Sequence, residues 1–581
     1  MPSMHDLPPV DASLTPPTVS TKRGAQTDSL SSPPAKRTRT TADAANPLHL
    51  KPLGNLMFAP EHRHTRANGL GSLAALPDEL LLSSILTLLT GEDLVRMAAA
   101  SRAFFAWSCV EGLWKGLYIQ KTQGRLLKWH GSWRSSYIAT FLRPASLADS
   151  DEPLPSTSIS TPTLHSDVLF QPALCAAFDA RTIFNTASFV PTIPRIPGVG
   201  VSPSTLPYEP VILTGLMDTW GAMKSSTSRR WTLPHLAVRF STQLFRAEAT
   251  LATLPAYAAY HDACAQDESP LYLFESEFVR KTEGAGGPSF GDDYEVPPCF
   301  GEDLFSVMGD ERPDYRWLIV GPTRSGSTWH VDPNHTSAWN AVATGDKAWV
   351  MFPPDVTPPG VYASADGAHV EAPLSLAEWF LSYYPAAKAA YGARAKDPAT
   401  RGKMREGICR AGEVLYVPSG WWHIVVNLSP AIAVTQNYVS HRELPAVLRF
   451  MRDRPAQVSG FKLRSGPVVE GGLDEDECDE SGGGEVFARF VSALRARGGD
   501  TATMLDTALS EIGGEERRVR SELEEGEKAK RRGAGGMWRA LKEEQAEEEG
   551  EGGFSFGFGL DEGDFEEDED GEAAGLGGGA A

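Results

Sequence analysis

The residues of this chain with the greatest chemical potential are two histidines and an aspartate. His330 and Asp332 are separated by one residue, and His423 follows far downstream in a Gly-Trp-Trp-His segment. Two imidazoles and one carboxylate are the ligands that non-heme Fe(II) sites use when they leave positions open for a co-substrate and O₂. A His-x-Asp triplet alone is a weak signal, because it easily arises by chance in a chain with 13 histidines. The surrounding segments must decide whether this is a metal site.

The sequence predicts that β-strands position the three side chains. Side chains on a strand alternate faces, so we expect His330 and Asp332 to point the same way from one strand. Residues 413–427 contain two apolar segments around a Pro-Ser-Gly turn, with His423 near the start of the second. We therefore expect His423 on a different strand, across a barrel from the other two ligands.

A lysine begins one of the predicted strands near the triplet. Residues 337–342 are predicted to form a strand, 344–346 a turn, and 347–352 the returning strand. Lys347 begins this otherwise apolar and aromatic strand. It either extends to solvent at a barrel rim or pairs with a buried anion.

The strand after His423 carries a second candidate. Residues 431–438 are rich in β-formers, and if residues 427–431 close a hairpin, Thr435 lies opposite His423. Thr435 is then either an ordinary β-branched strand residue or a hydroxyl donor to a carboxylate beside the metal. His335, just beyond the triplet, is predicted to lie in a loop outside the metal site.

Eight motifs in a fixed order surround these residues. They are residues 269–274, 315–322, 324–327, 330–333, 336–340, 345–352, 418–423 and 435–437. Together they resemble the JmjC-domain Fe(II)/2-oxoglutarate oxygenases, specifically the phosphatidylserine-receptor-like branch associated with arginine demethylation and lysyl hydroxylation. The resemblance covers roughly residues 166–456. It implies a mainly β fold, the double-stranded β-helix or cupin jelly roll, with surrounding helices.

The resemblance assigns a role to each candidate in the metal site. His330, Asp332 and His423 correspond to the Fe(II) ligands and catalytic centre. Lys347 corresponds to the cation that holds the distal carboxylate of 2-oxoglutarate. No ligand position departs from the family pattern, which implies a catalytic domain.

Further residues correspond to positions around the co-substrate. Thr435 and Tyr272 would add hydroxyl hydrogen bonds to the distal carboxylate, and Asn340 would contact the co-substrate near the metal. Ser327 stands where the family commonly has threonine, a change that retains the hydroxyl.

The implied reaction consumes 2-oxoglutarate and O₂ and hydroxylates a C–H bond close to the iron. On an N-methyl group the hydroxylated product releases formaldehyde, and on a side-chain methylene the alcohol persists. Both outcomes begin with the same hydrogen abstraction and differ only in which carbon lies near the iron. Demethylation and hydroxylation, and arginine and lysine targets, therefore all stay open.

Composition restricts the compartment and the partners. The six cysteines form no C-x-x-C pair, which favours a reducing compartment over zinc modules or a disulfide framework. No apolar run reaches the roughly 18 residues that a membrane helix needs. The net charge of −21 opposes tight binding to nucleic acid, so we expect a protein substrate, such as a basic histone or RNA-processing protein tail.

The chain divides by composition into six segments. They are a disordered start at 1–70, an F-box-like helical domain at 71–144, a linker at 145–165, the oxygenase domain at 166–456, a helical region at 457–515, and an acidic disordered tail at 516–581. Basic clusters at 22–23 and 36–39 are typical of a bipartite nuclear import signal, although two such clusters also occur by chance in solvated tails. We therefore expect a nuclear protein.

The helical segment offers an alternative function. Residues 76–80, Leu-Pro-Asp-Glu-Leu, open a predicted amphipathic helix and resemble the start of an F-box. An F-box would bind a Skp-type adaptor of cullin ubiquitin ligases, and the JmjC domain would then only recognise a target. The other interpretation is a helical extension packed against the oxygenase. A third, a cupin barrel with another divalent metal and non-oxidative chemistry, is opposed by Lys347, since an anion-binding lysine has no clear use there.

Overall fold

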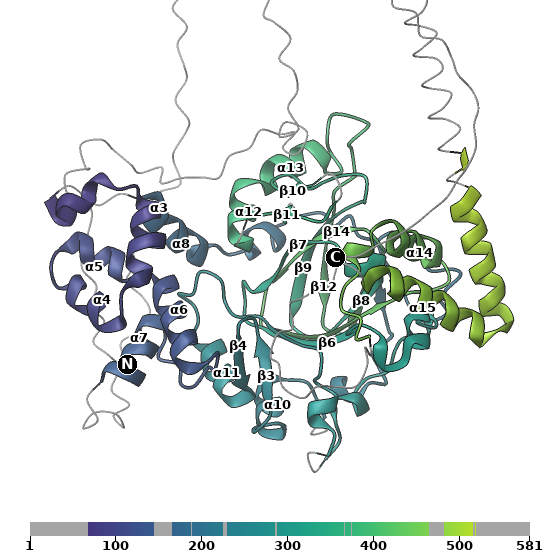
Figure 1. The fold of residues 1–581 in the computed structure, drawn as a ribbon, viewed down its shortest axis with the longest axis horizontal. Helices are drawn as coiled ribbons and strands as arrows, with labels where there is room; N and C mark the ends of the chain where they lie inside the picture. Colours follow the sequence, from purple (N-terminus) through teal and green to yellow (C-terminus); the bar gives the residue numbers. More distant parts are fainter. Residues whose placement is uncertain are drawn as a thin grey trace, which may run out of the picture.

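A computed structural model describes residues 68–143, 166–463 and 482–518, apart from short gaps at 188, 225–228, 285–286, 365–366, 374 and 515–516. Figure 1 shows a central β barrel with a group of helices at the N-terminal side and further helices at the C-terminal side. The predicted import signal, linker and acidic tail lie outside the described residues, and they stay predictions.

Two sheets form the barrel. The smaller sheet has the order β12 (Arg405–Arg410), β9 (Asp346–Phe352), β14 (Trp422–Asn427) and β7 (Gly326–His330). The larger has the order β1 (Arg195–Pro197), β2 (Val211–Thr214), β13 (Glu413–Val417), β8 (Ser337–Thr344), β15 (Ala431–Tyr438), β6 (Arg316–Gly321), β5 (Leu273–Glu275), β3 (Leu244–Ala247) and β4 (Thr250–Thr253). All neighbours except β1 and β2 are antiparallel.

Alternating side chains fill the inside of this barrel. Ile319 of β6, Trp349 of β9, Val425 of β14 and Ala433 of β15 belong to one buried cluster, to which β9 also contributes Met351, two residues after Trp349. Because both sheets contribute to this cluster, they face each other across it. The predicted double-stranded β-helix is confirmed.

The predicted hairpins are wrong, although the strands are correct. Residues 344–346 join β8 to β9, which lie in different sheets, and the segment after β14 likewise crosses to β15 in the larger sheet. The two crossings touch, since a Cβ on Gly345 would lie 2.2 Å from the carbonyl oxygen of Pro430. Thr435 therefore lies opposite Asn340 and Trp317, not His423.

Helices cover the outside of the smaller sheet. Figure 1 shows α12 (Leu376–Ser382) and α13 (Tyr384–Tyr391), both from the insertion after β9, above β7 and β9. Trp379 and Phe380 of α12 share a buried cluster with Val350 of β9. The insertion thus covers this sheet with two helices, and the first turn of α12 also lines the cavity described below.

The N-terminal helices form a compact group that is packed against the oxygenase domain. Its helices are α3 (Asp78–Leu80), α4 (Gly91–Ala98), α5 (Arg102–Ser108), α6 (Glu111–Thr122) and α7 (Trp133–Tyr137), with helical turns at Leu81–Leu88 and Ile138–Leu142. Leu251 of β4 accepts a hydrogen bond from the Leu126 amide (2.9 Å) and donates one to the Gly124 carbonyl (2.7 Å). The Trp133 indole donates to Asp267 (3.1 Å). The helical extension is therefore an integral part of the oxygenase body.

The predicted C-terminal helices also pack on this body. α14 (Leu444–Asp453), α15 (Gly482–Arg497) and a helix over residues 499–514 share one buried cluster that includes Leu448, Phe490 and Leu505. Leu304 and Val439 belong to the same cluster, so these helices pack on the oxygenase domain.

Among the described residues, no single helix is both long and apolar enough to cross a membrane. The segments Asn68–Ala75 and Asp78–Leu88 reach that length and apolarity only as a pair, and they are bent by 98° at the break between them.

Candidate metal and co-substrate site

The three predicted ligands lie together at one end of the barrel. β7 ends at His330, β14 begins at Trp422, and the register of the two strands pairs His330 with His423. The imidazole centroids are 4.0 Å apart. One potential ligand atom from each histidine and from Asp332 all lie within 4.8 Å of one another.

Two details of the predicted arrangement are corrected. His423 lies on the strand adjacent to His330 in the same sheet, not across the barrel. Asp332 lies beyond the end of β7, in an extended conformation (φ −60°, ψ 140°) immediately before Pro333. Because proline lacks the backbone N–H that a strand ladder needs, the pairing stops before it.

Backbone contacts orient both histidines. Nδ1 of His330 lies 2.7 Å from the carbonyl oxygen of Thr328, and Nδ1 of His423 lies 3.0 Å from that of Trp421. A carbonyl can only accept, so Nδ1 carries the proton in both rings and Nε2 remains free to bind a metal. Oδ2 of Asp332 is buried and has no hydrogen-bond partner among the described residues. A bound cation would satisfy it.

The protonation of these groups favours a cation. Burial, together with the charge of His330, holds the pKa of His423 well below its usual range, so His423 is the neutral imidazole that metals bind. Burial raises the pKa of Asp332, while the charge of His330 and a hydrogen bond from Asn437 act in the opposite direction. A carboxylate in this environment gains stability from a nearby positive charge.

Lys347 is buried inside the barrel, with 1% of its surface exposed. Its ammonium donates to the Tyr272 hydroxyl (2.7 Å), and no described carboxylate forms an ion pair with it. Burial lowers its pKa to about 7, with a small opposing effect from Cys409. Of the two predicted alternatives, a buried position is observed, and an unpaired buried ammonium is a site for an anion.

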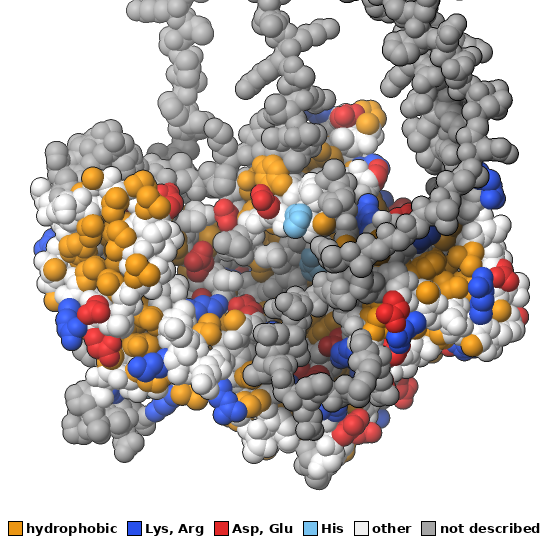
Figure 2. All heavy atoms as spheres, viewed as in Figure 1, with side chains coloured by type: hydrophobic (Ala, Val, Ile, Leu, Met, Phe, Trp, Pro, Cys, Tyr) orange, Lys and Arg blue, Asp and Glu red, His pale blue; other side chains and the backbone are white. Residues whose placement is uncertain are grey.

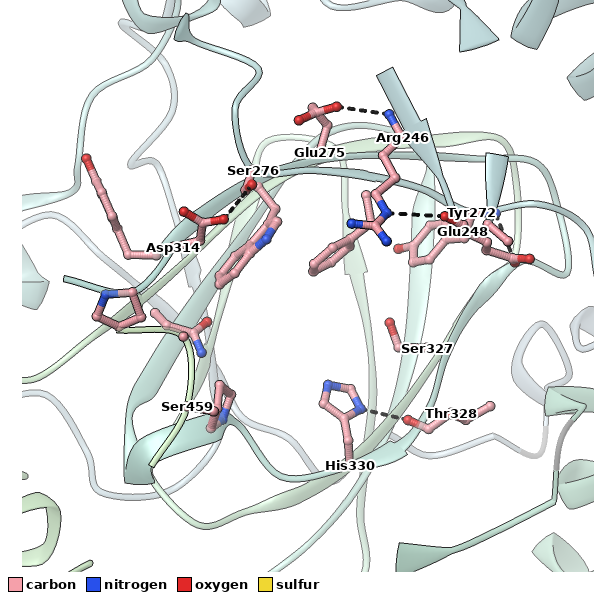
Figure 3. A pocket seen from close by; sticks show the side chains of 18 of the residues that line it. Arg246, Glu248, Tyr272, Glu275, Ser276, Asp314, Ser327, Thr328, His330 and Ser459 are labelled. Atoms are coloured by element: carbon pink, nitrogen blue, oxygen red, sulfur yellow. Dashed lines mark hydrogen bonds between the residues drawn. The ribbon is translucent and has the colours of Figure 1, made fainter. Parts of the chain in front are cut away.

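The remaining predicted residues also face the barrel interior. Asn340 of β8 is buried, and its Oδ1 has no partner among the described residues. Thr435 is half-buried and donates to the carbonyl of Trp339 (2.9 Å), so its hydroxyl is already engaged as a donor. Tyr272 is buried beside Lys347. Figure 3 shows Ser327 and His330 projecting into the same opening.

Tyr272, Ser327 and His330 line a large cavity of about 1730 Å³. Its wall includes residues from the barrel, from α12, from the loop at Gln123 and Gly124 of the N-terminal helices, and from the C-terminal region. Figure 3 shows Tyr272 and Glu248 on one side of the opening and Asp314 on another. A peptide segment could therefore reach the metal cluster from solvent.

Sequence reasoning gave no role to two asparagines in this site. Asn427 is fully buried on β14 opposite Lys347 and donates to Ser325 Oγ (2.9 Å), and its Oδ1 has no hydrogen-bond partner within the described part of the chain. Asn437 donates to Thr336 Oγ1 (3.0 Å) besides its contact with Asp332. Strand alternation could have indicated both, because they lie four residues after His423 and two after Thr435.

The donor set fits the predicted metal and co-substrate. Two histidines with free Nε2 atoms and one carboxylate with an unpaired oxygen match an open Fe(II) site. A lone buried ammonium in the same barrel matches the distal carboxylate of a dicarboxylate such as 2-oxoglutarate. Together, the fold and the site define the class of Fe(II)- and 2-oxoglutarate-dependent oxygenases.

Comparisons with known proteins agree with this class. A family model described as a cupin-like domain matches residues 204–443. The chain is 40% identical over 417 residues to "Arginine-specific demethylase JMJ22" of Arabidopsis thaliana, covering 71% of this chain and 77% of that protein. It is 36% identical over 293 residues to "Bifunctional arginine demethylase and lysyl-hydroxylase psr-1" of Caenorhabditis briggsae, covering 47% and 68%.

A more distant relative names the cofactors. The human "2-oxoglutarate and iron-dependent oxygenase JMJD4" is 28% identical over 166 residues, which cover 28% of this chain and 36% of that protein. The chain belongs to the cupin-like JmjC family of iron- and 2-oxoglutarate-dependent oxygenases.

Proposed function

We propose that His330, Asp332 and His423 bind Fe(II) and that Lys347 binds the distal carboxylate of 2-oxoglutarate. The observation that carries this assignment is the unpaired buried ammonium of Lys347 inside the barrel whose mouth holds the three ligands. When bound, the iron and 2-oxoglutarate supply the oxidation: O₂ converts 2-oxoglutarate to succinate and CO₂, and one oxygen atom is inserted into a substrate C–H bond.

The protein's own residues position and shield these groups. The Nδ1 bonds to backbone carbonyls hold both imidazole planes and raise the basicity of Nε2. Tyr272 accepts from Lys347, so its hydroxyl proton is free to point at the same carboxylate. Asn340 lies beside Thr435 on the interior face, where its amide can contact the co-substrate.

The proposed substrate is an arginine or lysine side chain of a nuclear protein, such as a histone or an RNA-processing protein. The names of the JMJ22 and psr-1 relatives support these side chains. The cavity wall supports a cationic target, because Glu268 lines it without an ion pair to any described residue. Burial, followed by the charges of Asp267 and Glu378, raises the pKa of Glu268, and a bound cation would relieve this cost.

Basic peptides should reveal the reaction directly. We expect the chain, with Fe(II) and 2-oxoglutarate, to modify a peptide that carries methylated arginine or lysine and to release succinate in proportion. Mass spectrometry separates the outcomes, since loss of a methyl mass identifies demethylation and gain of one oxygen identifies hydroxylation. Omitting 2-oxoglutarate is the control. Absence of succinate and of any mass change across a panel of basic peptides would contradict the proposal.

A second candidate function is binding of a Skp-type adaptor through the N-terminal helices. Leu80, Leu88 and Val95 are 49%, 81% and 38% exposed, and Figure 2 shows apolar side chains gathered over this part of the molecule. Such a patch is typical of an interaction surface.

Copurification with a Skp-type adaptor tests this candidate. We expect Leu88→Glu to abolish capture, because it places a charge in the apolar surface. Val238→Glu, at an equally exposed position (82%) of α10 (Leu233–Arg239), should leave capture unchanged. Failure of the unaltered chain to bind the adaptor would leave the helices as an extension of the oxygenase alone.

A further inference from the structure

An exposed aromatic pair lines the cavity. Phe274 of β5 is 39% exposed, more than any other phenylalanine or tryptophan among the described residues. It stacks on Trp317 of β6, with ring centroids 5.4 Å apart and planes inclined by 27°. Both residues line the cavity that contains His330. Apolar side chains that are grouped and exposed in a cavity are typical of a binding site.

Trp317 connects this pair to the interior of the oxygenase site. It packs against the buried cluster inside the barrel. The registers of β6, β15 and β8 place Trp317, Thr435 and Asn340 side by side in one row across the larger sheet. The aromatic pair therefore lies on the wall that leads from the cavity to the co-substrate residues.

No cation of the described residues covers either ring of this pair. Other aromatic rings of the cavity and barrel already have cations of the chain over them. The Arg312 guanidinium lies 3.6 Å from the centroid of Tyr315, and Lys347 lies 5.4 Å from Tyr272 and 5.9 Å from Trp349. Among the described residues, no lysine or arginine occupies the corresponding position over Phe274 or Trp317.

Two carboxylates of the cavity wall that lie close to this pair in sequence are, by contrast, already paired. Asp314 accepts hydrogen bonds from Ser276 (2.8 Å) and Lys462 (2.7 Å). Glu275 pairs with Lys281 at 2.6 Å. At this wall of the cavity, the aromatic faces are thus the more available cation-binding groups.

We propose that Phe274 and Trp317 form a platform on which the guanidinium plane of an arginine or N-methylarginine side chain stacks, and that this platform selects arginine over lysine. A guanidinium is planar and weakly hydrated, so it stacks well on aromatic faces, whereas the ammonium of lysine is compact and strongly hydrated. Methyl groups on the guanidinium add apolar contact with the rings. This inference rests on the proposed function and specifies its substrate class.

Replacing Phe274 by leucine tests the platform. Leucine keeps the site apolar but removes the aromatic face. We expect kcat/KM for a methylarginine peptide to fall about tenfold, and this fall should come from a higher KM. For the matched lysine peptide, kcat/KM should change less than about twofold. The KM for 2-oxoglutarate should not change. Phe274→Tyr should restore the methylarginine preference. Tyr208→Leu removes a similarly exposed aromatic (42%) outside the cavity and should have no effect.

The outcomes separate this inference from the proposed function. If the unaltered chain forms no succinate with any basic peptide, the proposed function fails. A second outcome is that the unaltered chain turns over basic peptides while Phe274→Leu lowers kcat/KM equally for both peptides, or for neither of them. That result overturns the platform, and the proposed function stands. A chain that acts on lysine peptides and leaves methylarginine peptides untouched also overturns the platform. Unchanged thermal unfolding of Phe274→Leu excludes misfolding as the cause of a loss.

Discussion

Replacing His330 by alanine is expected to abolish Fe(II)-dependent succinate formation, with a fall of more than about a hundredfold. Loss of outer residues that merely orient metal ligands costs about 10- to 100-fold, and loss of a ligand should exceed that. The variant leaves only His423 and Asp332, which cannot hold Fe(II) as tightly as three ligands. Bound iron, measured by elemental analysis after gel filtration, should fall in parallel with turnover.

His335→Ala provides the control for this prediction. His335 follows the triplet and is also partly buried, but its Nδ1 lies near Ser419 Oγ (3.4 Å) and its ring packs on Phe450. It is outside the cluster of three ligands, so iron content and succinate formation should remain near those of the unaltered chain. Retention of bound iron in His330→Ala, or equal loss in His335→Ala, would contradict the assignment of the ligands.

Local sequence patterns predicted the strands of the barrel but not their partners. The strand at residues 347–352 and the turn before it are both present, yet the turn carries the chain from one sheet to the other. A Gly-containing turn between two apolar strands is compatible with either a hairpin or a crossing. The choice depends on packing between distant segments, here Gly345 against Pro430, and a local pattern contains no such information.

In the site, too, local motifs predicted the residues but not their surroundings. The identity of the ligands and of Lys347 followed from the family resemblance, because each is a motif position. Whether Lys347 is buried or at a rim depends on what β12, β14 and the Tyr272 segment place around it, and the sequence left both alternatives open. The unpaired oxygens of Asp332 and Asn340 are likewise consequences of neighbours far apart in sequence.

Replacing Lys347 by methionine should raise the KM for 2-oxoglutarate by more than about a hundredfold. Methionine has a similar length, so the fold should persist, but a buried carboxylate would then have no charged partner, which typically costs about 2–5 kcal/mol. The same substitution should increase the thermal stability of the protein. Without 2-oxoglutarate, the variant should unfold at a higher temperature than the unaltered chain at pH 6, because it no longer buries an unpaired ammonium.

The pKa of Lys347 gives this stability difference a defined pH dependence. The folded-state pKa is about 7 and the ordinary value is 10.5. Between these values the unfolded chain binds more protons than the folded chain, so the stability of the unaltered protein rises with pH through this window. The advantage of Lys347→Met should therefore be largest below pH 7 and shrink as the pH rises. A constant difference from pH 6 to 9 would contradict a buried titrating lysine.

The affinity for 2-oxoglutarate should also depend on pH, but it should fall as the pH rises. Only the protonated ammonium attracts the distal carboxylate, so above pH 7 the free protein must take up a proton to bind, and the KM should rise up to about tenfold per pH unit. Lys347→Arg separates charge from geometry, since a guanidinium stays charged across this range. Its KM should be higher than that of the unaltered chain at pH 6 because the larger group fits the Tyr272 site less well, yet it should not vary with pH. A KM for the unaltered chain that is flat from pH 6 to 9 would show that another group binds the carboxylate.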